Sequence, residues 1–259
     1  MTSHATRLWA LDGAWFTVDT GLLVVNGSGD VTLPVPTFLI EHPRGLVLFD
    51  TGVVPQASVD PHGVYGELAE HVNIDFTPDK QVDRQIEALG FSTTDVTHVV
   101  VSHSHFDHTG GMYLFPQAKF FIGGADLPYA YWPMPAASVF FRTADLDPTR
   151  GFDWNPLAGD HDLFADGSVT VLSMPGHTPG NSSLMVRLAN RTFMLTGDTV
   201  HVREALDNEL PMPSDYSTKT AVDSVRRLAQ LSAADDADIW IAHDPQDWAK
   251  FFKGAKAYE

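Results

Sequence analysis

The 259-residue sequence contains no cysteine. Disulfide bonds and thiolate metal ligands are therefore excluded, and cysteine usage does not indicate the redox compartment. No uninterrupted apolar stretch reaches the roughly 20 residues that a membrane-spanning helix needs. Asp12, Gly13 and Asp19 interrupt the apolar residues near the N-terminus, so a secretory signal is not expected either. We expect a cytoplasmic protein with no membrane partner.

Basic residues are also scarce. The chain has 16 lysines and arginines against 33 aspartates and glutamates, which gives a formal net charge of -17. A surface of this sign repels phosphate backbones, so we expect no nucleic-acid partner, and the charge argues against a nuclease. The apolar fraction of 44% is ordinary for a globular protein, and no repeat or linker marks a boundary. We predict a single domain over residues 1–259.

Histidine, in contrast, is concentrated in one place. Residues 103–108 read His-Ser-His-Phe-Asp-His, preceded by a β-branched run at 96–101 and followed by Thr-Gly-Gly. The run therefore lies where a predicted strand passes into a loop, the usual position of ligand-binding residues in layered α/β folds. A solvated histidine-rich loop is the alternative, and the strand that leads into the run argues against it. The candidate metal ligands are His103, His105, Asp107 and His108.

Three more candidate ligands follow predicted strands further along the chain. His177 lies in Pro-Gly-His-Thr-Pro-Gly after residues 169–174, Asp198 follows 193–195, and His243 follows 239–241. A lone histidine at a strand end is more often a surface residue than a ligand, so none of the three carries the argument alone. Together with the first run they give seven groups, more than one ion needs.

Seven donors suffice for two divalent ions. A first ion would use His103, His105 and His177, and Asp198 is free to bridge to a second. The second ion would use Asp107, His108 and His243. A donor set of imidazoles and carboxylates without thiolate suits zinc, and it also suits iron, manganese or cobalt.

The complete pattern resembles the metallo-β-lactamase superfamily, which is defined by His-x-His-x-Asp-His and a later His, Asp and His. The Asp50-Thr51-Gly52 turn also resembles the early Asp-Thr-Gly turn of that superfamily, whose aspartate supports the site. An aspartic protease is the alternative for that turn, and the metal cluster elsewhere disfavours it. Within the superfamily, residues 102–111, 175–180 and 243–245 are similar to those of the N-acyl-homoserine lactonase group. The resemblance implies an α/β fold, a four-layer αβ/βα sandwich with the metals at one edge of the paired sheets.

The same resemblance implies a dinuclear metal-dependent hydrolase that opens the rings of N-acyl-homoserine lactones, a quorum-quenching activity. A hydroxide held between the two ions would attack the lactone carbonyl, and Asp107 would pass a proton to the departing alkoxide. The expected partner is thus a small lactone or ester.

Two positions depart from the group: Asn181 replaces a histidine often seen after the Gly-His-Thr-Pro-Gly turn, and the second departure, at residue 201, matters more. Members of the group commonly carry a tyrosine three residues after the bridging aspartate, where the tyrosine contacts the substrate carbonyl, and this chain has His201. An imidazole can still donate a hydrogen bond or a proton there. The alternatives are a supporting or surface histidine, or a different lactone or ester as substrate.

Three other functions remain open. A thioester or ester hydrolase similar to glyoxalase II would keep the metals but need a cationic pocket, and Lys and Arg are scarce near the motifs. An iron-dependent oxidoreductase of the same fold would show redox-active metal. A non-catalytic binding protein on this scaffold would have lost ligands, whereas all seven are present.

Residues 127–141 are expected to shape specificity, as an aromatic segment without a convincing strand or helix period. It forms either an apolar wall for an acyl chain or a packing surface on the core or on a second subunit, which would make a homodimer. Trp9, Trp15 and Phe16 fit either arrangement. The segment contributes Leu127, Tyr129, Tyr131, Trp132, Met134, Phe140 and Phe141.

Outside these motifs the pattern predicts ordinary packing. Residues 82–89 and 221–231 carry apolar side chains at helical spacing, which indicates two amphipathic helices packed on the core. His98 lies inside a predicted strand and is interpreted as a packed or half-buried side chain. Asp244 either orients His243 or caps the turn that follows.

Overall fold

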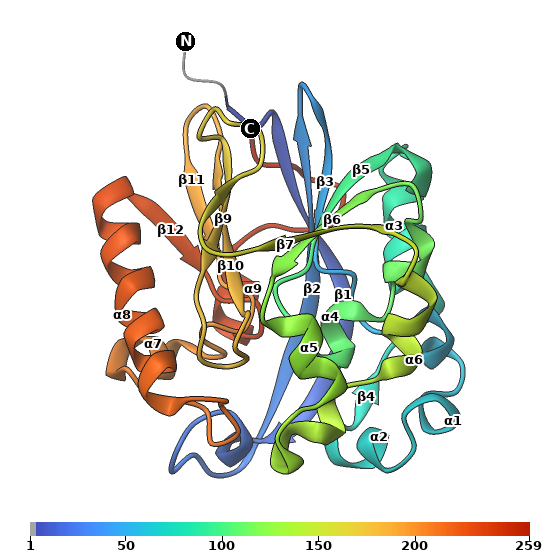
Figure 1. Cartoon of the computed structure of the whole chain (residues 1–259), viewed down its shortest axis with the longest axis vertical. Helices are drawn as coiled ribbons and strands as arrows, with labels where there is room; N and C mark the ends of the chain where they lie inside the picture. Colours follow the sequence, from blue (N-terminus) through green and yellow to red (C-terminus); the bar gives the residue numbers. More distant parts are fainter. Residues whose placement is uncertain (1–3) are drawn as a thin grey trace.

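A computed structural model describes residues 4–259 and arranges the twelve strands of this range in two sheets that face each other (Figure 1). The larger sheet has seven strands in the order β4-β1-β2-β3-β5-β6-β7. Antiparallel pairs join β1 to β2 and β2 to β3, whereas β3, β5, β6 and β7 run parallel. Its strands are β1 (Arg7–Asp19), β2 (Asp30–His42), β3 (Gly45–Phe49), β4 (Ile74–Asp75), β5 (Val96–Val100), β6 (Lys119–Gly123) and β7 (Asp153–Leu157).

The second sheet has five strands in the order β12-β11-β10-β9-β8. Strands β8 to β11 pair antiparallel, and β12 joins β11 in parallel. Both sheets are therefore mixed. The strands are β8 (His161–Asp162), β9 (Val169–Ser173), β10 (Ser182–Arg187), β11 (Thr192–Leu195) and β12 (Ala237–Trp240).

The layer between the sheets follows from the alternation of side chains along each strand. In β2, Phe38 and Ile40 face the second sheet while Leu39 faces the opposite side. Phe38 meets Trp240 of β12 edge to face, with ring centroids 5.1 Å apart. Residues 33–40 of β2 are all buried and almost all apolar, so both faces of this strand are covered, as expected for a sheet packed on both sides.

Helices cover the two outer faces. Helix α3 (Val82–Ala88) packs Val82 and Ile86 on the larger sheet. Helix α8 (Thr218–Asp235) packs Val225 and Leu228 on the smaller one, and Figure 1 shows it beside β11 and β12. Both predicted amphipathic helices are thus confirmed, and so is the four-layer αβ/βα sandwich.

The remaining helices are short and lie in the connections. The α-helices are α1 (Pro61–Tyr65), α2 (Glu67–Val72), α4 (Phe106–Thr109), α5 (Asp126–Tyr131), α6 (Thr143–Leu146), α7 (Arg203–Asn208) and α9 (Pro245–Lys250). The 3-10 turns are η1 (Thr20–Leu22), η2 (Pro55–Ser58), η3 (Pro78–Lys80), η4 (Thr93–Asp95), η5 (Met112–Leu114), η6 (Pro135–Phe140) and η7 (Asp147–Thr149). Over residues 4–259, which the structure describes, no helix combines the length and apolar character needed to cross a membrane.

The aromatic segment differs from expectation. The sequence predicted no regular structure over residues 127–141, but α5 and η6 occupy most of it. The helical period is hidden because α5 has only 6 residues and carries Pro128 in its first turn, where proline is tolerated. The prediction of an irregular segment was therefore wrong in detail.

Candidate metal centre

The predicted ligands come together at one end of the sandwich, where β5, β11 and β12 end. His103 follows β5, and His105 is the N-cap residue of α4. Asp198 follows β11, His243 follows β12, and His177 lies in the turn between β9 and β10. Asp107 and His108 are carried by α4, the short helix that begins directly after His105. All seven side chains lie close together, so the sequence prediction that they converge is confirmed.

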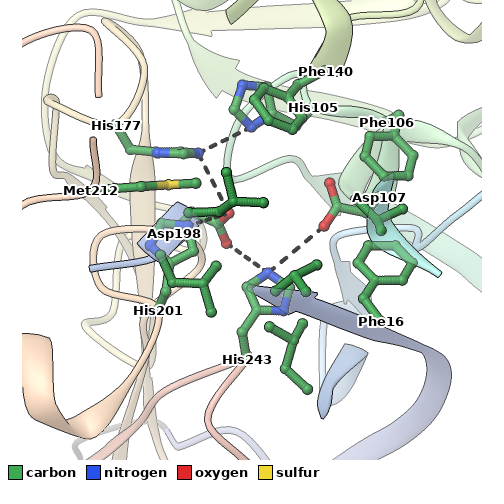
Figure 2. A pocket seen from close by; sticks show the side chains of 15 residues that line it. Phe16, His105, Phe106, Asp107, Phe140, His177, Asp198, His201, Met212 and His243 are labelled. Atoms are coloured by element: carbon green, nitrogen blue, oxygen red, sulfur yellow. Dashed lines mark hydrogen bonds and ion pairs between the residues drawn. The ribbon is translucent and has the colours of Figure 1, made fainter. Parts of the chain in front are cut away.

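Asp198 occupies the centre of this cluster (Figure 2). Its Oδ2 lies 3.6 Å from Nε2 of His103 and 3.5 Å from Nε2 of His177. Its Oδ1 lies 3.3 Å from Nε2 of His108 and 3.0 Å from Nε2 of His243. One carboxylate oxygen thus faces each set of imidazoles, which is the arrangement of a bridging carboxylate.

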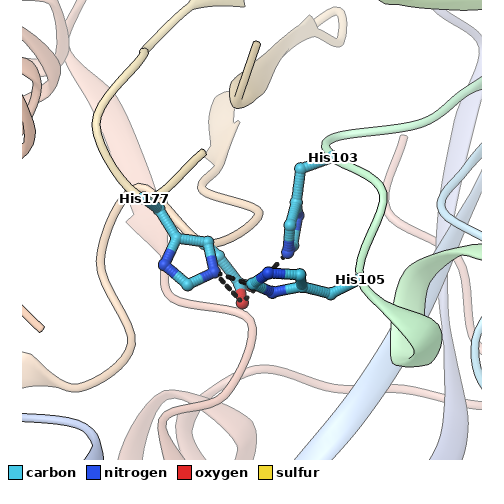
Figure 3. Close-up of side chains that lie close together, drawn as sticks. His103, His105 and His177 are labelled. Atoms are coloured by element: carbon cyan, nitrogen blue, oxygen red, sulfur yellow. Dashed lines mark hydrogen bonds and ion pairs between the residues drawn. The ribbon is translucent and has the colours of Figure 1, made fainter. Parts of the chain in front are cut away.

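The first group consists of three imidazoles and Asp198, with ligand atoms that all lie within 4.8 Å of one another. Figure 3 shows His103, His105 and His177 pointing their rings toward a common point. Nε2 of His177 lies 3.0 Å from Nδ1 of His105. Two nitrogens bound tetrahedrally to one zinc ion would be about 3.4 Å apart, so these separations suit a shared ion.

The second group is Asp107, His108 and His243. Oδ2 of Asp107 lies 3.5 Å from Nε2 of His108 and 3.8 Å from Nε2 of His243. This group therefore differs from the first in having a carboxylate of its own besides Asp198. The structure divides the seven residues as the sequence predicted.

The buried polar atoms of the cluster fit divalent cations. Nε2 of His103 and Nε2 of His108 are buried and have no hydrogen-bond partner among the described residues. Buried polar atoms ordinarily have partners, so atoms without one that face a common centre indicate a ligand. The donor types, imidazole and carboxylate, are those that zinc and related divalent metals bind. The site is therefore suited to divalent metal ions.

The ionisation of His103, His105 and Asp198 agrees with this. His108 and His243 differ, because the Asp198 carboxylate raises the pKa of both rings although burial acts in the opposite direction. Burial lowers the pKa of His103 and of His105, and neighbouring imidazoles lower it further, so both rings are neutral and keep a lone pair for a metal. Burial acts against ionisation of Asp198, yet His108 and His243 hold its pKa well below the usual range. A neutral imidazole and an ionised carboxylate are the forms that coordinate a cation.

Outer hydrogen bonds orient several of the rings. Asp50 accepts from His108 Nδ1 at 2.9 Å through Oδ2 and from the Ser102 backbone N–H at 2.7 Å through Oδ1. The supporting role that the resemblance implied for Asp50 matches these contacts. The backbone carbonyl of Pro34 accepts from His243 Nδ1 at 2.7 Å. Such partners fix the tautomer and direction of a metal-binding imidazole.

Sequence reasoning missed Pro34 and Asp215 as partners of the site. Asp215 Oδ1 lies 3.1 Å from His177 Nδ1. A backbone carbonyl carries no residue-type signal, so Pro34 could not have been found. Asp215 lies in a Pro-Ser-Asp turn and looks like an ordinary turn aspartate. Ser217, two residues later, marks the start of α8 as its N-cap but does not indicate a contact with His177.

Asp244 does not orient His243. Its carboxylate accepts hydrogen bonds at 2.8 Å from the backbone N–H groups of Gln246 and Asp247, and at 2.7 Å from that of Arg203. It is the N-cap of α9. Of the two alternatives for Asp244, the structure supports the cap.

Backbone geometry lets the loops approach the centre. Gly197, with φ of 50°, precedes Asp198, and a Cβ there would lie 2.7 Å from Cβ of Ser102. Any side chain at this position would push the Asp198 loop away from the His103 loop. Asp50 itself has a φ of 59°, an unusual conformation for a non-glycine residue, and its two hydrogen bonds hold it in place.

His201 lies at the centre and not on the surface. It is buried, and its Nε2 lies 3.0 Å from Oδ2 of Asp198. Its ring is 4.8 Å from that of His177 and stacks at 5.9 Å on that of His243. Burial lowers the pKa of His201 although Asp198 acts in the opposite direction, so the ring is neutral and donates through Nε2 to the carboxylate.

An apolar pocket opens beside the cluster (Figure 2). Its walls come from β1, β2, η1, α2, α4, η6 and the loops that precede α8. No lysine or arginine is among the residues that line it. The aromatic segment contributes only Phe140 to this pocket, whereas Trp132 is 88% exposed and points elsewhere. The apolar wall consists of Phe16, Val18, Leu22, Leu23, Leu33, Val72, Phe106, Phe140 and Met212.

The sequence left open whether the other aromatic and apolar residues line the pocket or pack on the core. Leu127 and Phe141 pack against the core beneath the larger sheet, and Trp9 is part of that core. Trp15 packs edge to face on Trp248, at 6.4 Å between ring centroids. Packing on this chain's own core thus accounts for these four side chains, whereas Tyr131 and Met134 are exposed.

Comparison with known proteins agrees with the fold and the site. The family model of the metallo-beta-lactamase superfamily matches residues 31–235. The chain belongs to this superfamily. An N-acyl homoserine lactonase, AttM of Rhizobium radiobacter, is 35% identical over 238 residues, which cover 90% of each chain. An N-acyl homoserine lactonase of a Bacillus species is 26% identical over 215 residues, covering 82% of each.

Solved structures of the superfamily share the architecture. An N-acyl homoserine lactone hydrolase with the product N-hexanoyl-L-homoserine bound at its catalytic metal centre superposes with a TM-score of 0.86. The superposition covers 98% of this chain and 100% of the other, at 20% sequence identity. The resemblance to this superfamily that the sequence motifs indicated is confirmed.

Proposed function

We propose that the protein is a dinuclear metal-dependent lactonase that opens the ring of N-acyl homoserine lactones. The observation that carries the proposal is Asp198, whose two oxygens each face one set of imidazoles and which lines a pocket with an apolar wall. The pocket suits a neutral ligand with an apolar chain, and the relatives named above are lactonases for such molecules.

Two zinc ions are the proposed cofactors, one for each donor group. His103, His105 and His177 would hold the first and Asp107, His108 and His243 the second, with Asp198 shared between them. Bound divalent ions would supply Lewis acidity, which activates water near neutral pH and stabilises developing negative charge on oxygen.

Asp107 is the proposed proton carrier. Its side chain lines the pocket and is 11% exposed, so a substrate can reach it, while the imidazoles of His108 and His243 lie on its Oδ2. These imidazoles keep the pKa of Asp107 low although burial acts in the opposite direction. An ionised carboxylate at this position can accept a proton from the attacking water and return it to the leaving alkoxide.

His201 is proposed to act at the substrate carbonyl, where lactonases of this group commonly carry a tyrosine. In the arrangement described above its Nε2 is engaged by Asp198. Contact with the carbonyl oxygen therefore requires the ring to exchange that hydrogen bond for one to the substrate. Until then His201 holds the bridging carboxylate in place.

The alternative hydrolase, acting on an anionic thioester, is less well supported. Such a substrate needs cationic side chains for its carboxylates. The fifteen residues that line the pocket include no lysine or arginine, so no cationic side chain is available for such carboxylates.

Metal analysis combined with a substrate panel tests the proposal. We expect close to two metal ions per chain and turnover of N-acyl homoserine lactones, with little turnover of S-lactoylglutathione. A simple γ-lactone without an acyl chain is the matched control, because it offers the same ring and leaves the apolar wall empty. Two bound metals with no lactone turnover would preserve the hydrolase class and remove the lactonase assignment.

A further inference from the structure

The segment between α7 and α8 carries an aspartate, Asp215, that faces the metal centre from outside. Its side chain is 3% exposed. Oδ1 lies 3.1 Å from Nδ1 of His177, and Oδ2 accepts a hydrogen bond from the backbone N–H of Met212 at 2.8 Å. Both oxygens of the carboxylate are therefore occupied by donors from different parts of the site.

This contact determines which nitrogen of His177 faces the centre. An ionised carboxylate only accepts hydrogen bonds, so Nδ1 of His177 carries the proton in this contact. Nε2 is then left with its lone pair, and it points to Nδ1 of His105 and Oδ2 of Asp198. Without Asp215, nothing among the described contacts of the ring would favour this tautomer over the other.

The backbone of the same segment is also tied to the His177 turn. The N–H of Tyr216 donates to the carbonyl of His177, and the N–H of Ser217 donates to that of Gly176, both at 3.0 Å. Met212, the other partner of Asp215, lines the apolar pocket. The segment thus connects the pocket wall to one metal-binding imidazole.

We propose that Asp215 is a positioning residue that fixes the tautomer and direction of His177, and through it the affinity for the ion held by His103, His105 and His177. The inference rests on the proposed function, since it concerns the same metal centre. Asp50 stands in the same relation to His108, so each donor group has one supporting aspartate. A carboxylate behind a metal-binding imidazole orients the ring and strengthens its electron donation.

The test is the metal affinity of Asp215→Asn, measured by competition with a chromophoric chelator. Asparagine has one oxygen for two N–H donors, so either His177 or Met212 loses its acceptor. We expect one of the two ions to bind about 10- to 100-fold more weakly, while the other is retained. Cobalt-loaded protein should show a changed visible spectrum for one of its two ions.

Two further variants separate positioning from general damage. Asp50→Asn should weaken the other ion, the one held by His108. Asp244→Asn is the matched control. Asp244 is a buried carboxylate next to His243 in the sequence, but it caps α9 and does not contact a metal-binding ring. Its replacement should therefore leave both ions bound. Circular dichroism of each variant checks that the fold is kept.

The outcomes are distinct. Asp215→Asn protein that binds both ions as tightly as the unaltered chain would overturn the proposal, and so would equal weakening of both ions in Asp215→Asn and Asp244→Asn. Selective loss of one ion supports it. Absence of lactone turnover by the unaltered protein would count against the proposed function alone, because the metal measurement still decides the role of Asp215.

Discussion

The metal centre and the apolar wall beside it are built in different ways. The ligands are buried and held by directed contacts: Asp50 orients His108, and the carbonyl of Pro34 orients His243. The wall residues Phe16 and Leu33 come from neighbouring strands and are held by packing alone. Directed contacts tolerate little change, whereas packing of apolar side chains tolerates volume-conserving substitution. The comparison suggests that the centre determines the chemistry and the wall determines the substrate.

The largest effect is expected at the residue shared by both donor groups. Asp198→Ala removes the oxygen that faces each set of imidazoles, so both ions should be lost. We expect kcat/KM for an acyl homoserine lactone to fall by at least about 1,000-fold, since several kcal/mol of charge stabilisation disappears with the metals. Metal content and turnover are measured on the same sample. Retention of two ions with normal turnover would show that Asp198 is not a bridge.

His201 lies at the boundary between centre and wall and should give an intermediate effect. His201→Ala should keep both ions and lower kcat by about 10- to 100-fold, because Asp198 loses a hydrogen-bond donor and the substrate carbonyl loses its proposed partner. His201→Tyr should restore much of the activity. A His201→Ala protein with full activity would remove the role proposed for this residue.

A change in the wall should alter substrate preference without altering metal content. Phe140 lines the pocket with its ring centroid 5.3 Å from that of His105. Phe140→Ala should raise KM for a decanoyl lactone by about 10-fold, which corresponds to roughly 1.4 kcal/mol of lost apolar contact. The effect on a butanoyl lactone should be smaller. Trp132→Ala is the control, as this side chain is 88% exposed outside the pocket. An equal change in KM for the decanoyl and the butanoyl lactone would contradict the proposal that Phe140 contacts the acyl chain.

The smallest effect concerns a histidine outside both regions. His98 is half-buried in β5, and burial lowers its pKa to about 4, with Lys119 and His42 acting in the same direction. In the unfolded chain its pKa is about 6.5. Since the folded state disfavours the proton, the stability contribution of His98 is complete above pH 6.5 and is lost as the pH falls toward 4.

Denaturant unfolding at pH 7.5 and pH 5 measures this contribution. Unaltered protein should lose more unfolding free energy between the two pH values than His98→Gln, because glutamine cannot take up a proton. The difference between the two proteins cancels the pH dependence of the metal centre, which both contain. If both proteins lose the same unfolding free energy between pH 7.5 and pH 5, His98 does not take up a proton when the chain unfolds.

The donor cluster could be predicted from the sequence for a physical reason. Its residues are of rare, chemically specific types, and His103, Asp198 and His243 each follow a β-branched or apolar run that marks a strand. Because strand ends in a layered α/β fold meet at one edge, residue type and position together indicated the cluster. The four-layer architecture followed from the resemblance to the metallo-β-lactamase superfamily.

The wall and the outer hydrogen bonds could not be predicted in the same way. Leu33, Val72 and Met212 are ordinary apolar residues, and only the tertiary packing distinguishes those that line the pocket from those in the core. The aromatic segment at 127–141 was the expected wall because of its composition, yet only Phe140 reaches the pocket. Residue type predicts that a side chain will be buried, but it does not predict which other residues the side chain will contact.

A crystal structure of the metal-loaded protein, with anomalous scattering recorded at the metal edge, tests the central claim most directly. We predict two anomalous peaks about 3.5–4 Å apart, one beside His103, His105 and His177 and the other beside Asp107, His108 and His243, with Asp198 between them. A single peak, or two peaks without a shared Asp198 carboxylate, would contradict the dinuclear centre on which the proposed function depends.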